Sequence, residues 1–202
     1  MARLVLHIGT HKTGTTALQN AFHANRDLLA RHGLIYPSFH PHTGHHALLT
    51  DYIRLPSAYL HPDGGEAGLK RLAQTWQDKN VTLFLSSEEF SRGGGAGGQV
   101  DMARLREVFS GYAEVRVICV LRGQWQFLQS VYLEIARSRI PPAPPTLVEL
   151  ALKDHLIDGL WSDYAKIYAA VRKGFSAAEI EFVAFDRLNR APGGLIGAML
   201  AF

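Results

Sequence analysis

The chain has 202 residues, enough for one domain with a sizeable apolar core, and its 47% hydrophobic and 19% charged residues are ordinary for a globular protein. The formal net charge of +3 at pH 7 is too small to indicate a nucleic-acid partner, although it favours an anionic ligand. Cys119 is the single cysteine, so no intrachain disulfide can form, and its apolar neighbours predict a buried, unreactive thiol. The first apolar stretch is too short for a secretion signal, and no run approaches the roughly 18 residues of a membrane span. We therefore expect a cytoplasmic protein.

Short apolar runs alternate with helical patterns along the chain. Strands are predicted at 2–8, 33–37, 81–87, 114–122 and 179–185. Helices are predicted at 15–32, from about 45, and at 66–79, 101–110, 123–138, 146–155, 159–173 and from about 193, with loops at 92–99 and 141–145. Because alternating strands and helices indicate a parallel sheet covered on both faces, the predicted fold class is α/β, doubly wound, in a single domain over 1–202.

A glycine-rich turn separates the first predicted strand from the first predicted helix. Gly9 and Gly14 stand five residues apart, as in the phosphate-binding loop G-x-x-x-x-G-K-[ST], which indicates a P-loop NTPase-like fold. Thr15 stands where that motif has its lysine, and Lys12 comes two residues before the second glycine. Backbone N–H groups, a helix N-terminus and threonine hydroxyls are all suited to bind an anion in such a turn.

The stretch GTHKTGTTALQ resembles the phosphosulfate-binding loop of sulfotransferases, which use 3′-phosphoadenosine 5′-phosphosulfate (PAPS) as donor. In that family a lysine, one small residue, a glycine and two threonines open the first helix, and residues 12–16 match this order. The resemblance implies that the donor is bound by His11, Lys12, Thr13, Gly14, Thr15 and Thr16. It also implies that Lys12 is catalytic, neutralising charge on the bridging oxygen as the sulfuryl group leaves. No metal is implied, because the lysine and the helix dipole replace Mg²⁺.

A second motif follows the strand predicted at 114–122. Arg122 ends that strand, at the sheet edge where open α/β folds bind ligands, and Ser130 follows eight residues later. This spacing resembles the 3′-phosphate site of sulfotransferases, in which a tyrosine often stands at the position of Tyr132. The resemblance implies that Arg122 and Ser130 hold the 3′-phosphate, and the arginine fork suits a dianion. The family's later basic, glycine-containing loop is not found before Phe202, so we expect either a naturally short chain or one lacking a C-terminal portion.

Sulfuryl transfer needs a base that takes the acceptor proton. Glu88 and Glu89 follow the strand predicted at 81–87, and a glutamate at this place is the base in the carbohydrate sulfotransferases that the sequence resembles. Glu88 matches that place best, and Glu89, His11, His45 and His46 are the alternatives. Four histidines at 40, 42, 45 and 46 also invite a zinc interpretation, but their loose spacing and the lack of a nearby cysteine or carboxylate predict no metal site.

The sequence therefore predicts a sulfotransferase that moves a sulfuryl group from PAPS to a hydroxyl or amine. The expected partner is a carbohydrate-like acceptor, for instance a lipid-linked sugar. A non-catalytic nucleotide-binding protein of the same fold is one alternative, favoured by the missing C-terminal loop. An NTP-dependent kinase or NTPase is another, but it would need a lysine directly after Gly14.

Overall fold

The structure is a computed structural model and describes residues 1–39, 41–94 and 97–202. Its centre is a five-stranded sheet in the order β2-β3-β1-β4-β7. The strands are β1 (Arg3–His7), β2 (Leu34–Ile35), β3 (Thr82–Ser86), β4 (Glu114–Leu121) and β7 (Ile180–Ala184). Every pairing in this sheet is parallel, which confirms the predicted α/β class. The central strand β1 is buried along almost its whole length, as a strand covered on both faces must be.

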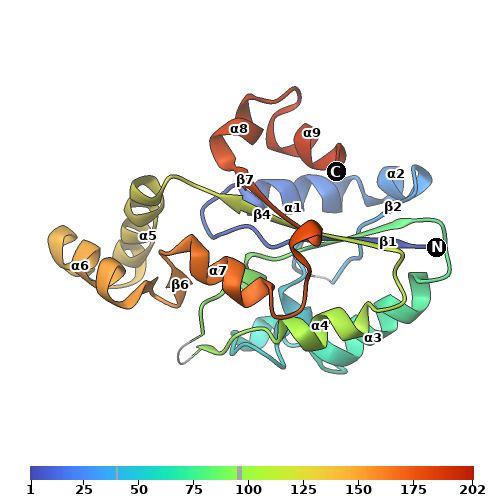
Figure 1. Cartoon of the computed structure of the whole chain (residues 1–202), viewed down its shortest axis with the longest axis horizontal. Coiled ribbons are helices and arrows are strands. Elements are labelled where there is room, and N and C mark those ends of the chain that lie inside the picture. Colours follow the sequence, from blue (N-terminus) through green and yellow to red (C-terminus); the bar gives the residue numbers. More distant parts are fainter. Residues whose placement is uncertain (40, 95–96) are drawn as a thin grey trace.

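Helices cover both faces of the sheet (Figure 1). One face carries α1 (Thr15–Ala24), α2 (Arg26–Arg31), α8 (Phe185–Arg190) and α9 (Gly194–Leu200). The other carries α3 (Gly65–Trp76), α4 (Met102–Val108) and α7 (Tyr164–Val171). Each layer has its own apolar core, with Phe22 and Met199 in the first and Leu69 and Ile167 in the second. In the part of the chain that the structure describes, no helix combines the length and apolarity needed to cross a bilayer.

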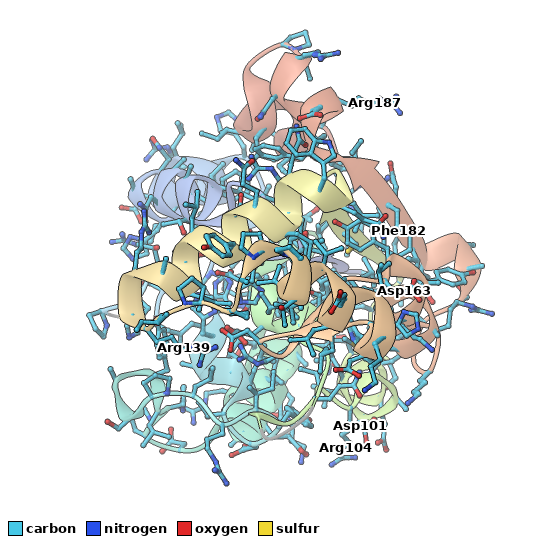
Figure 2. The ribbon with its side chains drawn as sticks, turned by 90° about the vertical axis from the view of Figure 1, so that its left-hand side faces the viewer. Asp101, Arg104, Arg139, Asp163, Phe182 and Arg187 are labelled. Atoms are coloured by element: carbon cyan, nitrogen blue, oxygen red, sulfur yellow. The ribbon has the colours of Figure 1, made fainter. Side chains whose placement is uncertain are left out.

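Two further helices, α5 (Gln124–Ser138) and α6 (Pro144–Asp154), lie beyond the carboxyl ends of the strands (Figure 1). The hairpin of β5 (Leu156–Ile157) and β6 (Leu160–Trp161) follows them, and a small core of Phe127, Leu147 and Ile157 joins these elements. Short 3₁₀ turns are η1 (His46–Leu49), η2 (Ser57–Tyr59), η3 (Glu88–Ser91) and η5 (Ala177–Glu179). Figure 2 views this end of the molecule, with α5 crossing in front of the sheet. This edge is therefore the place where residues following β1, β3 and β4 meet.

The helix predicted over 15–32 is interrupted at Asn25. Its backbone N–H and its side-chain amide both donate to the Ala21 carbonyl, at 3.2 and 2.8 Å, and this closes α1. Asparagine competes in this way with the backbone for helical hydrogen bonds, so a new helix, α2, begins at Arg26.

The helix predicted over 159–173 is wrong in its first part, because a β-hairpin precedes α7. Asp158 and Gly159 have positive φ angles of 52° and 79°, and they form the two-residue turn between β5 and β6. Three smaller differences remain. The helix predicted from about 45 is only the 3₁₀ turn η1, and Pro144 and Pro145, which were predicted in a loop, begin α6. Helix α8 was not predicted. Of the loop predicted at 92–99, residues 95 and 96 lie outside the described residues.

Candidate functional site

The glycine-rich loop between β1 and α1 is fixed to the neighbouring strand β4. The N–H groups of Ile8 and Thr10 donate to the carbonyls of Ile118 and Val120, at 2.9 and 3.0 Å. The hydroxyl of the buried Thr13 turns back to the Thr10 carbonyl at 2.6 Å. The Thr13 hydroxyl hydrogen is therefore used to shape the loop.

The backbone at the end of this loop suits an anion. Lys12 and Gly14 have positive φ angles of 69° and 77°, a pattern that turns successive N–H groups toward one side. The first turn of α1 lacks both an acidic residue and a side-chain cap in the described chain, so its positive dipole end is not neutralised locally. The Thr15 hydroxyl is buried with no hydrogen-bond partner among the described residues, and Thr16 is exposed. Because a buried unpaired hydroxyl is costly, an anionic ligand at this position fits the residues present.

We expect Gly14→Ala to lower the free energy of unfolding by about 1–3 kcal/mol. A Cβ at this position would lie 2.9 Å from Cδ2 of Leu195 and 3.2 Å from the Phe185 ring, at a φ that alanine adopts only with strain. Gly33→Ala is the matched control, because Gly33 has a similar φ of 79° and a Cβ there would meet no described atom within 4 Å. Urea denaturation of both variants tests this. A loss at Gly14 no larger than at Gly33 would mean that crowding of the new Cβ by Leu195 and Phe185 adds nothing to the backbone strain.

Lys12 reaches across to α5. Its Nζ lies 2.9 Å from a carboxylate oxygen of Glu134, which also contacts Arg137 at 3.0 Å. The hydrogen bond and the charge of Lys12 hold the pKa of the Glu134 carboxyl below its usual value. The Lys12 ammonium thus has a counter-charge within the protein, on the rim of the glycine-rich loop.

The two sequence motifs are joined by Arg122. Its Nη1 donates to the Ser130 hydroxyl at 2.8 Å and to the Lys12 carbonyl at 3.1 Å. Its guanidinium also lies 5.7 Å from the ring centroid of Phe185, and its own carbonyl accepts a hydrogen bond from the Tyr164 hydroxyl. The end of β4, helix α5 and the glycine-rich loop therefore form one connected unit. The assignment of a 3′-phosphate to Arg122 and Ser130 stays a prediction.

The two glutamates after β3 have different surroundings. Glu88 accepts a hydrogen bond from the Gln19 amide of α1 at 3.3 Å. One oxygen of Glu89 lies 3.2 Å from Nε2 of His11, and the other accepts from Arg92 at 2.9 Å. Burial opposes ionisation of Glu89, but its hydrogen bonds with His11 and Arg92, the charge of Arg92 and, when its ring is protonated, the charge of His11 outweigh burial and lower the pKa of Glu89 to about 2. Glu89 is therefore a carboxylate at neutral pH.

Comparison with known proteins identifies a shared fold but no family. No protein-family model and no curated protein matches the sequence. The structure is similar to that of a sulfotransferase from Alicyclobacillus acidocaldarius, with a TM-score of 0.59 and 16% identity over 98% of this chain and 78% of that chain. The chain shares the fold of that sulfotransferase. A gluconokinase from Sinorhizobium meliloti 1021 matches over 98% of this chain and 89% of that chain, but its TM-score of 0.37 and identity of 11% are too low to support an argument.

His45 and His46, two candidate bases, are engaged within the protein. His45 is fully buried, and its ring nitrogens contact the Pro37 carbonyl at 2.9 Å and the Ser86 N–H at 2.8 Å. Burial lowers the pKa of His45 to about 4. Nδ1 of His46 lies 2.7 Å from the Ser87 hydroxyl, and burial lowers the pKa of His46 as well. Both rings therefore serve the packing around the end of β3, and His45 has no nitrogen left for an acceptor proton.

Of the histidines considered for zinc, His42 and His46 both pack against Tyr59, with ring centroids 4.0 and 5.4 Å from that ring. His45 contacts Pro37 and Ser86 instead, and His40 lies outside the described residues. Within residues 1–39, 41–94 and 97–202, no three histidine, cysteine, aspartate or glutamate side chains gather in a way that could hold a metal ion.

Two residues of the site were not predicted. Glu134 lies one helical turn after Ser130 on α5, so its place on the same face was available from the helical period. Arg92 opens a glycine-rich stretch that gave no sign of its contact with Glu89, because that contact depends on the 3₁₀ turn η3.

Proposed function

We propose that the protein is a PAPS-dependent sulfotransferase that transfers a sulfuryl group to a hydroxyl or amine of an acceptor. The observation that carries this proposal is the hydrogen-bonded link from Ser130 through Arg122 to the Lys12 carbonyl. It joins the two elements that we propose to bind anions, one after β1 and one after β4, and PAPS carries two separate anionic groups. The fold shared with a sulfotransferase supports the proposal at the level of architecture.

In this proposal each element takes one end of the donor. The glycine-rich loop and the first turn of α1 bind the 5′-phosphosulfate through backbone N–H groups and through the hydroxyls of Thr15 and Thr16. The Arg122 fork and the Ser130 hydroxyl bind the 3′-phosphate. Because Arg122 also holds the Lys12 carbonyl, occupation of the 3′-phosphate site positions the loop that carries the catalytic lysine.

Lys12 has a separate role at the breaking bond. As the sulfuryl group leaves, negative charge grows on the bridging oxygen, and the Lys12 ammonium offsets it. To do so, Lys12 exchanges its contact with Glu134 for one with the donor. The exchange keeps the ammonium paired in both states, so its cost in desolvation is small.

Adenosine 3′,5′-bisphosphate, the product that the donor leaves behind, is expected to stabilise the fold more than ADP does, and without metal. At a hundredfold excess over Kd the stabilisation is about 2.7 kcal/mol. A thermal-shift series with the bisphosphate, ADP, AMP and ATP, each with and without Mg²⁺, tests this. A strong Mg²⁺-dependent shift with ATP and none with the bisphosphate would favour a kinase or NTPase. Binding of the bisphosphate without any consumption of PAPS would favour the non-catalytic alternative.

A further inference from the structure

A small cavity of about 110 Å³ lies beside the glycine-rich loop, between the loop, α5 and the β5–β6 hairpin. Its lining combines three apolar side chains, Val131, Ile135 and Leu160, with five polar ones, His11, Lys12, Arg92, Glu134 and Asp158. Lys12 therefore belongs both to the proposed donor site and to this cavity. A molecule held here would lie next to the proposed position of the transferring group.

The charges around this cavity are balanced within the protein. The pairs are Lys12–Glu134, Arg92–Glu89 and Asp158–Arg139, and Glu134 keeps Arg137 when Lys12 turns to the donor. Arg139, labelled in Figure 2, comes directly after the last residue of α5. Because each charged side chain of the lining has a counter-charge, the cavity offers little to an ionic ligand. Its carboxylate and nitrogen groups suit hydroxyls, and its apolar side chains suit a small carbon skeleton, so its chemistry fits a neutral polyhydroxyl compound.

His11 is the lining residue equipped to take a proton. Its Nε2 faces the ionised Glu89, and a carboxylate only accepts hydrogen bonds, so the neutral ring is assigned its proton on Nε2. Nδ1 then carries the free lone pair, and none of the hydrogen bonds of the described residues uses it. Glu89 is held in turn by Arg92 at 2.9 Å, with only 12% of its side chain exposed. A buried carboxylate that orients an imidazole is a recurring arrangement for a general base.

We propose that this cavity is the acceptor subsite, that it takes a neutral hydroxyl compound, and that His11 is the base, positioned by Glu89; this rests on the proposed function. The acceptor hydroxyl gives its proton to Nδ1 of His11 while its oxygen forms a bond to sulfur. The bond between sulfur and the bridging oxygen breaks, and its electron pair leaves with adenosine 3′,5′-bisphosphate. The acceptor departs as a sulfate ester, and the imidazolium releases its proton to solvent.

Glu88, the base expected from the sequence, has other neighbours. Its carboxylate accepts from Gln19 on α1, and its charge raises the pKa of the buried Tyr36, after the larger effect of burial. These neighbours come from α1 and from the segment after β2, whereas the cavity is formed by the glycine-rich loop, α5, the hairpin and Arg92, and Glu88 is not part of its lining. The assignment of the base to His11 and its assignment to Glu88 therefore predict opposite results in the same assay.

The kinetic test compares three variants with PAPS as donor and methyl β-D-glucopyranoside, glucosamine, glucuronate or water as acceptor. His11→Asn is expected to lower turnover by about 10²–10⁴-fold, and Glu88→Gln by less than about tenfold. Glu89→Gln is expected to lower turnover and also to shift the acid limb of the profile of turnover against pH. If Glu89 had a purely structural role, its replacement would not shift that limb. The neutral glycoside is expected to react faster than the two charged sugars. The reverse order of His11→Asn and Glu88→Gln, or a preference for a charged sugar, would overturn the proposal.

A second measurement needs no turnover, so it separates this proposal from the proposed function. Nitrogen NMR of the histidine rings is expected to show His11 with its proton on Nε2 and to show that Glu89→Gln removes this preference. Methyl β-D-glucopyranoside is expected to shift the His11 signals and to leave those of the exposed His32 unchanged. A different His11 tautomer, or no response of His11 to the glycoside, would overturn the acceptor subsite even if PAPS is consumed. If His11 shows the expected tautomer and responds to the glycoside, but the protein does not bind adenosine 3′,5′-bisphosphate, the proposed function is overturned instead.

Discussion

Lys12→Ala is expected to lower sulfuryl-transfer turnover by about 10²–10³-fold while the protein still binds adenosine 3′,5′-bisphosphate. The ammonium interacts with charge that develops only as the sulfur–oxygen bond breaks, so its loss appears in kcat more than in donor affinity. Alanine keeps the Cβ, so the backbone strain at the positive φ of 69° is the same in both proteins. Steady-state kinetics with PAPS, together with calorimetric titration of the bisphosphate, measure the two quantities separately.

The contact of Lys12 with Glu134 provides the control for this experiment. Lys12→Ala removes one of the two cations beside the Glu134 carboxylate and leaves Arg137. Glu134→Gln keeps the lysine but removes its counter-charge, and it is expected to change turnover by less than about tenfold, as the pair is partly exposed. If Glu134→Gln alone reproduced the loss of turnover, the Lys12–Glu134 ion pair, and not the Lys12 ammonium by itself, would be what turnover requires. Equal losses of turnover and donor affinity in Lys12→Ala would mean that Lys12 only binds the donor.

Arg122→Ala is expected to weaken the binding of adenosine 3′,5′-bisphosphate by about ten- to a hundredfold and to leave AMP binding almost unchanged. Hydrogen bonds to charged groups contribute roughly 1.5–3 kcal/mol, and AMP lacks the 3′-phosphate that Arg122 is proposed to hold. Calorimetric titration of both nucleotides against both proteins gives the comparison. Arg122→Lys should bind the bisphosphate with an affinity between those of the unaltered protein and Arg122→Ala, because lysine keeps the charge and loses the planar fork.

The structure makes AMP an essential control here. Arg122 also donates to the Lys12 carbonyl and to Ser130, so its removal loosens the glycine-rich loop as well as the 3′-phosphate site. A general loosening would weaken the binding of AMP and of the bisphosphate by the same factor. Equal losses for the two nucleotides would therefore assign Arg122 a structural role. Ser130→Ala, which leaves the bond from Arg122 to the loop in place, should show the same selectivity with a smaller loss.

Local patterns in the sequence were sufficient for the fold class and for the two motifs. Strands such as β4 are continuous apolar runs because parallel strands are buried on both faces, and this pattern is visible without knowledge of the neighbours. Arg122 and Ser130 are eight residues apart, at the end of a strand and on the helix after it, so their contact follows from the spacing. The Asp-Gly dipeptide at 158–159 is also a local signal, typical of a two-residue hairpin turn, and it is incompatible with the helix predicted from 159.

Contacts between distant residues were decided by the tertiary structure alone. Lys12 and Glu134 are separated by 122 positions, and His11 and Glu89 by 78. They meet because β1 lies between β3 and β4 in the sheet, so the residues that follow these parallel strands share one edge. The sequence places both glutamates after β3, and only the family resemblance favoured Glu88 as the base. The 3₁₀ turn η3 directs Glu89 to His11 and Glu88 to Gln19, because a change of one position along a helical turn rotates a side chain by roughly a quarter to a third of a circle.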